Sequence, residues 1–189
     1  MMPTRIHILG ASGAGTTTLG QALARSLRCP HLDTDDYYWA ATDPPFQQKR
    51  EAEERRRLLL DALARSESWA LSGSLCGWGD VAISQFTLVV FLWIPSDLRL
   101  ERLREREKRR YGTAIQPGGP MHSASTHFLE WAARYDAGDL EGRSRQRHET
   151  WLSALPCPII RIETDLPVLD KVRLVTRGLA PDAGCDSRP

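Results

Sequence analysis

The chain has 189 residues, 41% of them hydrophobic, which suits one globular domain with a hydrophobic core. Its formal net charge of +1 gives no electrostatic case for binding nucleic acid, and its longest apolar run, residues 88–94, is too short to cross a membrane. The four cysteines lack the paired spacing of a disulfide framework or a zinc site, so we predict a cytoplasmic protein with neither nucleic acid nor a membrane as its partner.

A glycine-rich loop near the N-terminus separates a predicted strand from a predicted helix. The alternating apolar residues 6–9 predict the strand, and leucines at every fourth position from Leu19 to Leu27 predict the helix. Glycines let the backbone amides of such a loop surround an anion, and the start of the helix adds partial positive charge. We therefore predict that the whole loop binds the phosphates of a nucleotide, through Gly10, Ala11, Ser12, Gly13, Ala14, Gly15, Thr16, Thr17 and Thr18.

This loop matches the phosphate-loop pattern G-x-x-x-x-G-K-[ST] with one departure. Gly10 and Gly15 occupy the glycine positions, and Thr17 supplies the hydroxyl that holds Mg²⁺ in such loops. Thr16 replaces the lysine that normally neutralises charge on the β- and γ-phosphates, so phosphoryl transfer here requires positive charge from elsewhere. The alternative interpretation is a strand-to-helix turn that binds no ligand.

Acidic and aromatic residues cluster after the second predicted strand, residues 31–32. Asp33, Asp35 and Asp36 are followed by three aromatic residues, 37–39. Ligands of open parallel sheets bind at the carboxyl ends of the strands, so we expect this cluster to face the phosphate loop. Its carboxylates can anchor Mg²⁺, or orient and deprotonate an attacking hydroxyl. The alternative is a set of turns and N-caps that opens the next helix.

The rest of the chain alternates between apolar runs and helical patterns. Five strands alternating with helices predict a three-layer α/β domain, with a five-stranded parallel sheet and helices on both faces. This single domain covers residues 1–179, and residues 180–189 form a flexible tail. Further strands are predicted at residues 69–71, 86–94 and 156–162, and helices at residues 47–66, 95–110 (with Ser96 or Asp97 as N-cap), 126–134, 143–155 and 167–179.

Two loops complete the predicted site. Residues 111–125 contain glycines and prolines and few apolar side chains, which indicates a mobile lid within residues 108–147. The loop after the third strand offers backbone amides and serine hydroxyls to an acceptor. Tyr37, Tyr38, Trp39 and Trp78 are compatible with an acceptor that has a flat face, although core packing explains them as well. The residues expected to bind the acceptor are Asp36, Tyr37, Ser72, Gly73 and Ser74.

Taken together, these segments resemble the P-loop small-molecule and nucleotide kinases, a group that includes shikimate, gluconate, adenylate and cytidylate kinases. The resemblance extends to about residue 178 and implies the P-loop NTPase fold. The Asp-x-Asp of shikimate kinases resembles Asp33-Thr34-Asp35, which implies that Asp33 lies in the Mg²⁺ shell and Asp35 beside the acceptor hydroxyl. Adenylate kinases have lid arginines spaced like Arg134 and Arg145, which implies that these two stabilise charge during transfer.

Two features depart from this group. Thr16 resembles the archaeal cytidylate kinases, which have threonine in the lysine position. The arginine that nucleotide monophosphate kinases usually place after the third strand is absent from residues 72–79, which argues against a nucleotide acceptor.

The predicted function is ATP- and Mg²⁺-dependent phosphoryl transfer to a small metabolite or nucleotide. Asp35, Arg134 and Arg145 are the predicted catalytic residues, and Thr17 and Asp33 the predicted metal ligands. The partners are a nucleoside triphosphate and a small-molecule acceptor; the sequence leaves the oligomeric state open. The alternative is a nucleotide-binding protein or slow NTPase that has no acceptor substrate.

Overall fold

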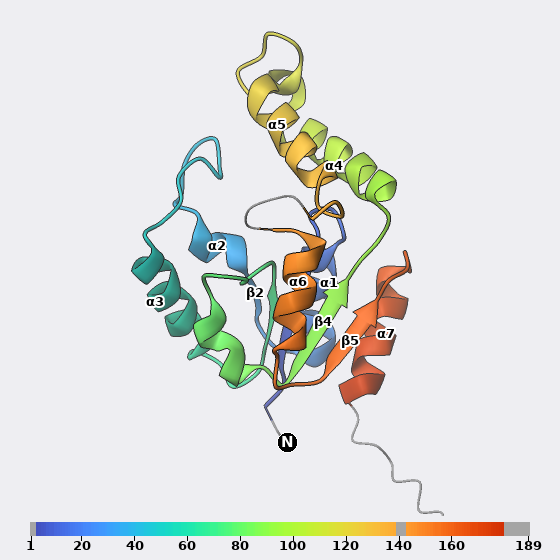
Figure 1. Ribbon diagram of the computed structural model, residues 1–189. Helices are drawn as coiled ribbons and strands as arrows, with labels where there is room; N and C mark the ends of the chain where they lie inside the picture. The colour runs from blue at the N-terminus through green and yellow to red at the C-terminus, as the bar shows by residue number, and fades with distance from the viewer. Residues whose placement is uncertain (1–2, 139–142, 180–189) are drawn as a thin grey trace, which may run out of the picture.

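The computed structural model describes residues 3–138 and 143–179, and its centre is a fully parallel five-stranded sheet (Figure 1). The strands are β1 (Arg5–Gly10), β2 (His31–Asp33), β3 (Trp69–Ser72), β4 (Leu88–Leu92) and β5 (Ile159–Ile162). They lie in the order β2-β3-β1-β4-β5, so β1 occupies the middle of the sheet. The predicted parallel sheet is confirmed, and the predicted tail, residues 180–189, lies outside the described residues.

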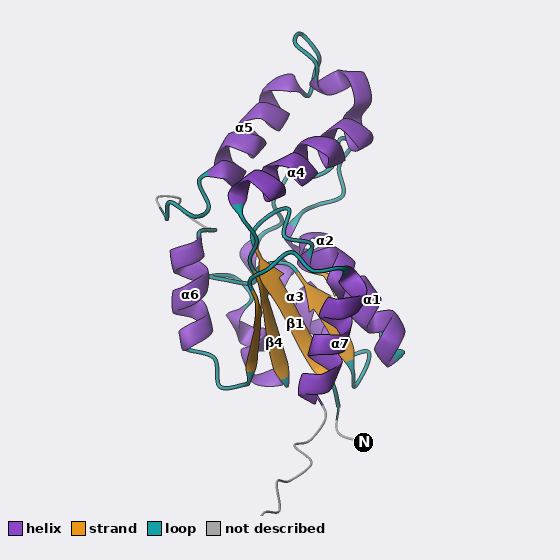
Figure 2. Ribbon diagram, turned by 90° about the vertical axis from the view of Figure 1, so that its right-hand side faces the viewer, coloured by secondary structure: helices purple, strands orange, loops and turns teal. Residues whose placement is uncertain are grey.

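Helices cover both faces of the sheet, as predicted. Figure 2 shows α1 and α7 against one face and α6 against the other, while α4 and α5 form a hairpin beyond the carboxyl edge of the sheet. None of the helices in the described segments combines the length and hydropathy that a membrane span requires. The α-helices are α1 (Thr16–Leu27), α2 (Thr34–Tyr38), α3 (Ala52–Leu63), α4 (Ser96–Tyr111), α5 (His122–Ala133), α6 (Arg145–Ser153) and α7 (Val168–Leu179).

Strand alternation divides the core into two clusters. Ile6 and Ile8 of β1 pack with Leu23 of α1 on one face, whereas Leu9 packs with Leu59 of α3 on the other. All five residues of β4 are buried, because neighbouring strands and both helical layers surround it. Burying a side chain of this size contributes about 1.5–3 kcal/mol, so the two clusters hold the three layers together.

Several predicted element boundaries differ from those in the structure. The helix predicted at residues 47–66 begins only at Ala52, because Lys49 pairs with Trp39 in an antiparallel bridge that directs this stretch of backbone into a loop. The N-cap of α4 is Pro95, and no side chain caps that helix. The segment predicted as a mobile excursion contains a 3₁₀ helix at residues 112–115 and the first turn of α5, which begins at His122.

A buried arginine joins the base of the α4–α5 hairpin to the domain. Arg99 of α4 is completely buried and donates to the carbonyl oxygens of Ile94 and Ala132, at 3.2 and 3.3 Å. Its Nη2 also pairs with Asp136 Oδ2 at 2.5 Å, and its guanidinium carbon lies 5.2 Å from the centre of the Tyr135 ring. Charge, hydrogen bonds and packing thus fix α5 against the start of α4.

We expect Arg99→Leu to lower the free energy of unfolding by about 3 kcal/mol, the cost of removing one partner of a buried ion pair. Urea denaturation followed by circular dichroism measures this change. Arg104→Leu, an exposed position on the same helix, is the control and should change it by less than about 0.5 kcal/mol. Equal stability of the Arg99 variant and the wild type would contradict this account of the hairpin base.

A histidine lies at the centre of the sheet. His7 of β1 is fully buried, stacks on Phe86 at 5.0 Å and donates through Nδ1 to the Leu71 carbonyl at 3.2 Å. Its Nε2 has no partner, and burial lowers the pKa of His7 to about 3. The ring is therefore neutral in the folded protein at neutral pH.

This buried histidine predicts a loss of stability in acid. Below pH 6.5 the unfolded chain protonates its histidine, whereas folded His7 stays neutral down to about pH 3. Because the unfolded state then binds more protons, His7 makes the free energy of unfolding decrease as pH falls from 6.5 toward 3, by on the order of 1 kcal/mol per pH unit. Denaturation curves across this range should have a shallower pH slope for His7→Leu; an unchanged slope would show that His7 does not titrate in this way.

Candidate functional site

A cavity of about 1610 Å³ lies where the carboxyl edge of the sheet faces the α4–α5 hairpin. The loops that follow β1, β2 and β3 line one side of it, and α4 and α5 line the other. All nine residues of the predicted phosphate loop, 10–18, are among its lining residues. The structure therefore brings the loop, the acid cluster and part of the predicted acceptor loop into one space.

The phosphate loop has a free helix N-terminus. Gly13 and Gly15 have positive φ angles of 84° and 92°, which side chains rarely adopt, and a Cβ at Gly13 would lie 2.7 Å from the Arg99 carbonyl oxygen. No side chain caps α1, and its first turn contains no acidic residue. The amides at the start of α1 are thus available to an anion from the cavity.

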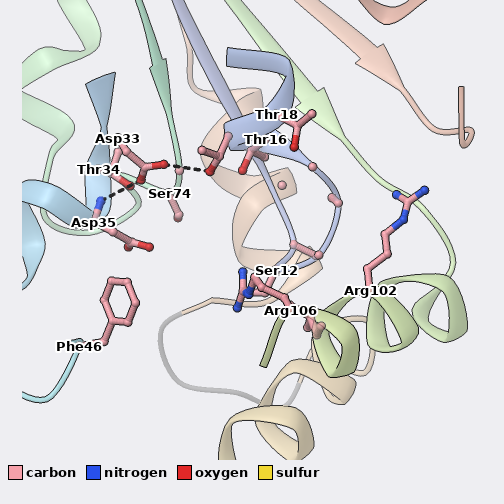
Figure 3. Close-up of a pocket in the computed structure, with 18 of the residues that line it drawn as sticks. Ser12, Thr16, Thr18, Asp33, Thr34, Asp35, Phe46, Ser74, Arg102 and Arg106 are labelled. Carbon is pink, nitrogen blue, oxygen red and sulfur yellow. Dashed lines mark hydrogen bonds between the residues drawn. The ribbon is translucent and has the colours of Figure 1, made fainter. Parts of the chain in front are cut away.

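Asp33 joins this loop to the end of β2. Its Oδ2 accepts hydrogen bonds from Thr17 Oγ1 at 2.9 Å and from Ser72 Oγ at 3.1 Å. Its Oδ1 accepts a hydrogen bond from the Asp35 amide at 3.1 Å, which Figure 3 shows between the two residues. A hydroxyl and a carboxylate at hydrogen-bond distance are hard oxygen donors of the kind that Mg²⁺ prefers. The described residues contain no cluster of three His, Cys, Asp or Glu side chains suited to a metal. Mg²⁺ does not need such a cluster, because it usually keeps several waters and also binds phosphate oxygens. One carboxylate and one hydroxyl therefore fit Mg²⁺ as its protein ligands.

Asp35 lies in the first turn of α2 and lines the same cavity. Burial raises the pKa of its carboxyl; Asp33 adds to that increase, and the positive charges of Arg143 and Arg106 oppose it. The Asp33 side chain also caps α2, so for Asp33 the structure bears out the alternative interpretation of this cluster as a helix cap. Asp36 is exposed and also lines the cavity.

Positive charge reaches the cavity from residues that the sequence analysis did not single out. Arg143 approaches the phosphate loop, with its Nη1 3.5 Å from Ser12 Oγ. Arg102, Arg106 and Arg110 lie one turn apart on α4, and each lines the cavity. Their spacing of four residues could have indicated a shared face, whereas nothing in the local sequence pointed to Arg143.

The two predicted lid arginines lie elsewhere. Neither Arg134 nor Arg145 is among the residues that line the cavity. Arg145 is the first residue of α6, where it lies 3.7 Å from Glu163 and 4.6 Å from the centre of the Trp93 ring. Arg134 follows α5 and is exposed. Their role in transfer stays a prediction.

The acceptor residues predicted from the loop after β3 separate into two groups. Gly73 and Ser74 line the cavity. Ser72 is fully buried, and its hydroxyl is hydrogen-bonded to Asp33 and His31. Tyr37 does not line the cavity; it packs against the hydrophobic cluster on the α3 face instead.

Ser74 belongs to a buried hydrogen-bonded chain. Its Oγ lies 3.1 Å from His148 Nε2, and the Tyr135 hydroxyl lies 2.8 Å from His148 Nδ1. Burial, together with the nearby charge of Arg143, lowers the pKa of His148 to about 3, so its ring is neutral. This chain links the wall of the cavity to α6 and to the end of the hairpin.

Comparison with known proteins places the chain in a family. Residues 6–118 match the family described as AAA domain. The uncharacterized protein YqaC of Bacillus subtilis (strain 168) is 54% identical over 171 residues, which cover 90% of this chain and 94% of that protein. Shikimate kinase 2 of Sodalis glossinidius (strain morsitans) is 49% identical over 41 residues, which cover 22% of this chain and 24% of that protein.

Solved structures share the fold over nearly the whole chain. A shikimate kinase from Acinetobacter baumannii in complex with shikimate has a TM-score of 0.59 and 19% identity, covering 94% of this chain and 93% of that one. The chain therefore belongs to the AAA-domain family and has the fold of the P-loop small-molecule kinases, with Thr16 at the lysine position of the phosphate-loop pattern.

Proposed function

We propose that this protein transfers a phosphoryl group from ATP to a hydroxyl of a small-molecule acceptor. The observation that carries this proposal is the meeting, in one cavity, of the amide-lined loop, the Thr17–Asp33 oxygen pair and Asp35. The shared fold with a shikimate kinase in complex with shikimate supports it. A protein that only binds a nucleotide has no use for a half-buried acid such as Asp35 beside the phosphate loop.

Each part of the cavity has a role in this reaction. The amides of the phosphate loop bind the polyphosphate, and Thr17 and Asp33 hold Mg²⁺, which neutralises charge on the phosphates when bound. Asp35 orients the acceptor hydroxyl and accepts its proton; its raised pKa favours that acceptance. The α4–α5 hairpin covers the cavity and excludes water from it, as a lid does.

The missing lysine charge comes from arginines. Arg143 approaches the loop through Ser12, and Arg106 is close enough to Asp35 to affect its pKa. An arginine that stabilises the transition-state charge contributes about 10³–10⁵ in rate in GTPases, a magnitude large enough in principle to replace the charge of one lysine. Arg134 and Arg145 would join this set only through movement of residues 108–147.

We expect Asp35→Asn to reduce phosphoryl transfer at least about 100-fold, because the amide cannot accept the proton of the acceptor hydroxyl. The Kd for ATP–Mg²⁺ should change little, since the proposal gives Asp35 no contact with the donor. The measurements are acceptor-dependent ATP consumption and calorimetric titration with ATP. Asp97→Asn, an exposed acid at the start of α4, is the matched control. Loss of nucleotide affinity would instead assign Asp35 to the metal or to structure.

The origin of the compensating charge is tested by rescue. Arg143→Gln should lower the rate of transfer at least about 100-fold, and adding Thr16→Lys to that variant should restore part of the loss by returning a cation to the loop. Arg147→Gln, an exposed position on α6 outside this cavity, is the control. An unchanged rate in Arg143→Gln would show that another group supplies the charge.

A further inference from the structure

Three buried polar side chains form a hydrogen-bonded row that ends at the cavity. Ser74 follows β3, Tyr135 follows α5 and His148 lies in α6, so the row joins three separate segments. These residues are 7%, 2% and 0% exposed, and Ser74 is the member of the row that lines the cavity. We call Ser74, His148 and Tyr135 the polar row.

Ser74 lies beside the acids of the proposed site. Its neighbour Gly73 packs so closely against Thr34 that a Cβ at Gly73 would lie 3.0 Å from Thr34 Cβ. Figure 3 shows Ser74 next to the turn that carries Asp33 and Asp35. The Ser74 hydroxyl therefore belongs to the same part of the cavity as Asp35.

A neutral imidazole has one N–H donor and one acceptor nitrogen, so the polar row can run in only two directions. Burial, the charge of Arg143 and the nearby His7 lower the pKa of His148 to about 3, which keeps its ring neutral. In the first direction, Tyr135 donates to Nδ1, and the Nε2–H of His148 donates to Ser74 Oγ. In the second, Ser74 donates to Nε2, and Nδ1–H donates to the Tyr135 oxygen. The distances of 3.1 Å between Ser74 and His148 and 2.8 Å between Tyr135 and His148 permit both.

The surroundings of Tyr135 select the first direction. Burial and the charge of Asp136 raise the pKa of Tyr135, so its hydroxyl keeps its proton. Within residues 3–138 and 143–179, His148 is the hydrogen-bond partner of that hydroxyl. In the second direction, the tyrosine proton would be a buried donor without an acceptor, which is unfavourable. The Ser74 proton has no such constraint, because Ser74 lines the cavity.

In the first direction, Ser74 receives a hydrogen bond and keeps its own proton to donate. The Cys76 thiol, which also lines the cavity, is a neighbouring group that can accept it. Burial raises the pKa of this thiol to about 11, and a hydrogen bond with Ser74 opposes that increase. The thiol therefore stays protonated, and its sulfur is only a weak acceptor. An oxygen atom of a ligand is a stronger partner for the Ser74 hydroxyl.

We propose that His148 and Tyr135 are positioning residues that fix the Ser74 hydroxyl as a hydrogen-bond donor to an oxygen atom of the acceptor. Tyr135 fixes the tautomer of His148, and His148 donates to the Ser74 oxygen. The Ser74 proton is then left for the ligand. The identity of that ligand as a phosphoryl acceptor rests on the proposed function, whereas the direction of the polar row does not.

The opposite direction would give the cavity a different chemistry. A serine that donates to a histidine base is the arrangement of an activated nucleophile. The proposed direction excludes it, because Nε2 of His148 already carries a proton. A pKa of about 3 also makes His148 a poor base at neutral pH. The position of one proton on the His148 ring thus distinguishes a hydrogen-bond donor from a nucleophile at Ser74.

Nuclear magnetic resonance locates that proton. Long-range ¹H–¹⁵N correlation spectra of the intact protein with ¹⁵N-labelled histidine, recorded at neutral pH, show which ring nitrogen is protonated in each of the five histidines. The His148 signals are identified by their nuclear Overhauser contacts with Tyr135 and by their loss in His148→Gln. We expect the proton on Nε2, and a proton on Nδ1 would overturn the proposal.

The role of Tyr135 is tested in the same spectra. Tyr135→Phe removes the donor that fixes the direction, so the Nδ1–H form of His148 should also appear. Tyr37→Phe is the matched control and should change nothing, because Tyr37 packs in the hydrophobic cluster on the α3 face, and the hydrogen bonds to His148 within the described segments come from other residues. The Nε2–H form alone in Tyr135→Phe would show that Tyr135 does not set the tautomer.

Acetate, a small molecule with oxygen acceptors, probes the hydrogen bond that Ser74 donates. It is titrated into the intact protein saturated with Mg²⁺ and a non-hydrolysable ATP analogue, so that the phosphate loop is already filled, and binding is followed through the backbone amide signals of residues 73–76. Ser74→Ala and His148→Leu should weaken binding about tenfold, the effect of one charge-assisted hydrogen bond. His148→Gln should retain the wild-type affinity, because its amide can donate to Ser74 and accept from Tyr135.

The outcomes distinguish this inference from the proposed function. If wild type and Ser74→Ala bind acetate equally, or the wild type does not bind it, Ser74 donates to no ligand, and the kinase proposal stands. Equal losses in His148→Gln and His148→Leu would reduce His148 to a packing role. If the ATP analogue does not bind in the presence of Mg²⁺, the proposed function fails, whereas the direction of the polar row is still decided by the spectra, which need no nucleotide.

Discussion

The constraint on which the rest of this structure depends is the parallel arrangement of its strands. Because β1, β2 and β3 run in the same direction and lie side by side, their carboxyl ends open at one edge of the sheet. Residues distant in the sequence, such as Thr17, Asp33 and Ser72, meet there through hydrogen bonds of 2.9 and 3.1 Å. At the same edge, the start of α1 has no side-chain cap, so its backbone amides are free to bind an anion without any lysine.

The absence of that lysine changes how charge is distributed around the cavity. A lysine within the loop would carry its charge on the element that binds the phosphates. Here the positive charge comes from α4 and from Arg143, which belong to separate segments that reach the cavity from outside the loop. In the proposed reaction, the charge near the phosphates would therefore depend on the position of the hairpin, so that movement of the hairpin would change the electrostatics of transfer.

The base of the hairpin is accordingly built from polar groups that are buried and paired. Arg99 joins α4 to the end of α5 through its ion pair with Asp136. The preceding residue, Tyr135, is hydrogen-bonded to His148, which is hydrogen-bonded in turn to Ser74 on the cavity wall. Buried polar chains of this kind are stable only when every member has a partner, so they fix one relative arrangement of the elements that they connect. The neutral state of His148 lets it accept one hydrogen bond and donate the other.

The sequence by itself determined the local features. Glycine spacing and the apolar runs identified the phosphate loop, the five strands and the α/β class, because backbone conformation and burial periodicity are properties of neighbouring residues. The rule that ligands bind at strand ends also predicted that the acid cluster faces the phosphate loop, and the structure places Asp33 in contact with Thr17 of that loop. The start of α3 could not be predicted, since the bridge between Trp39 and Lys49 is a contact between segments that overrides helix propensity.

Only the tertiary structure decided which side chains share the cavity. Arg134 and Arg145 had the right spacing along the chain, yet Arg106, Arg110 and Arg143 line the cavity, because the directions of α4 and α6 determine which guanidinium groups point inward. Likewise, Tyr37 and Tyr38 are neighbours in sequence, but Tyr37 packs in the core and Tyr38 lines the cavity. Successive helical residues point in different directions, so what each contacts depends on the packing of the helix against the rest of the domain.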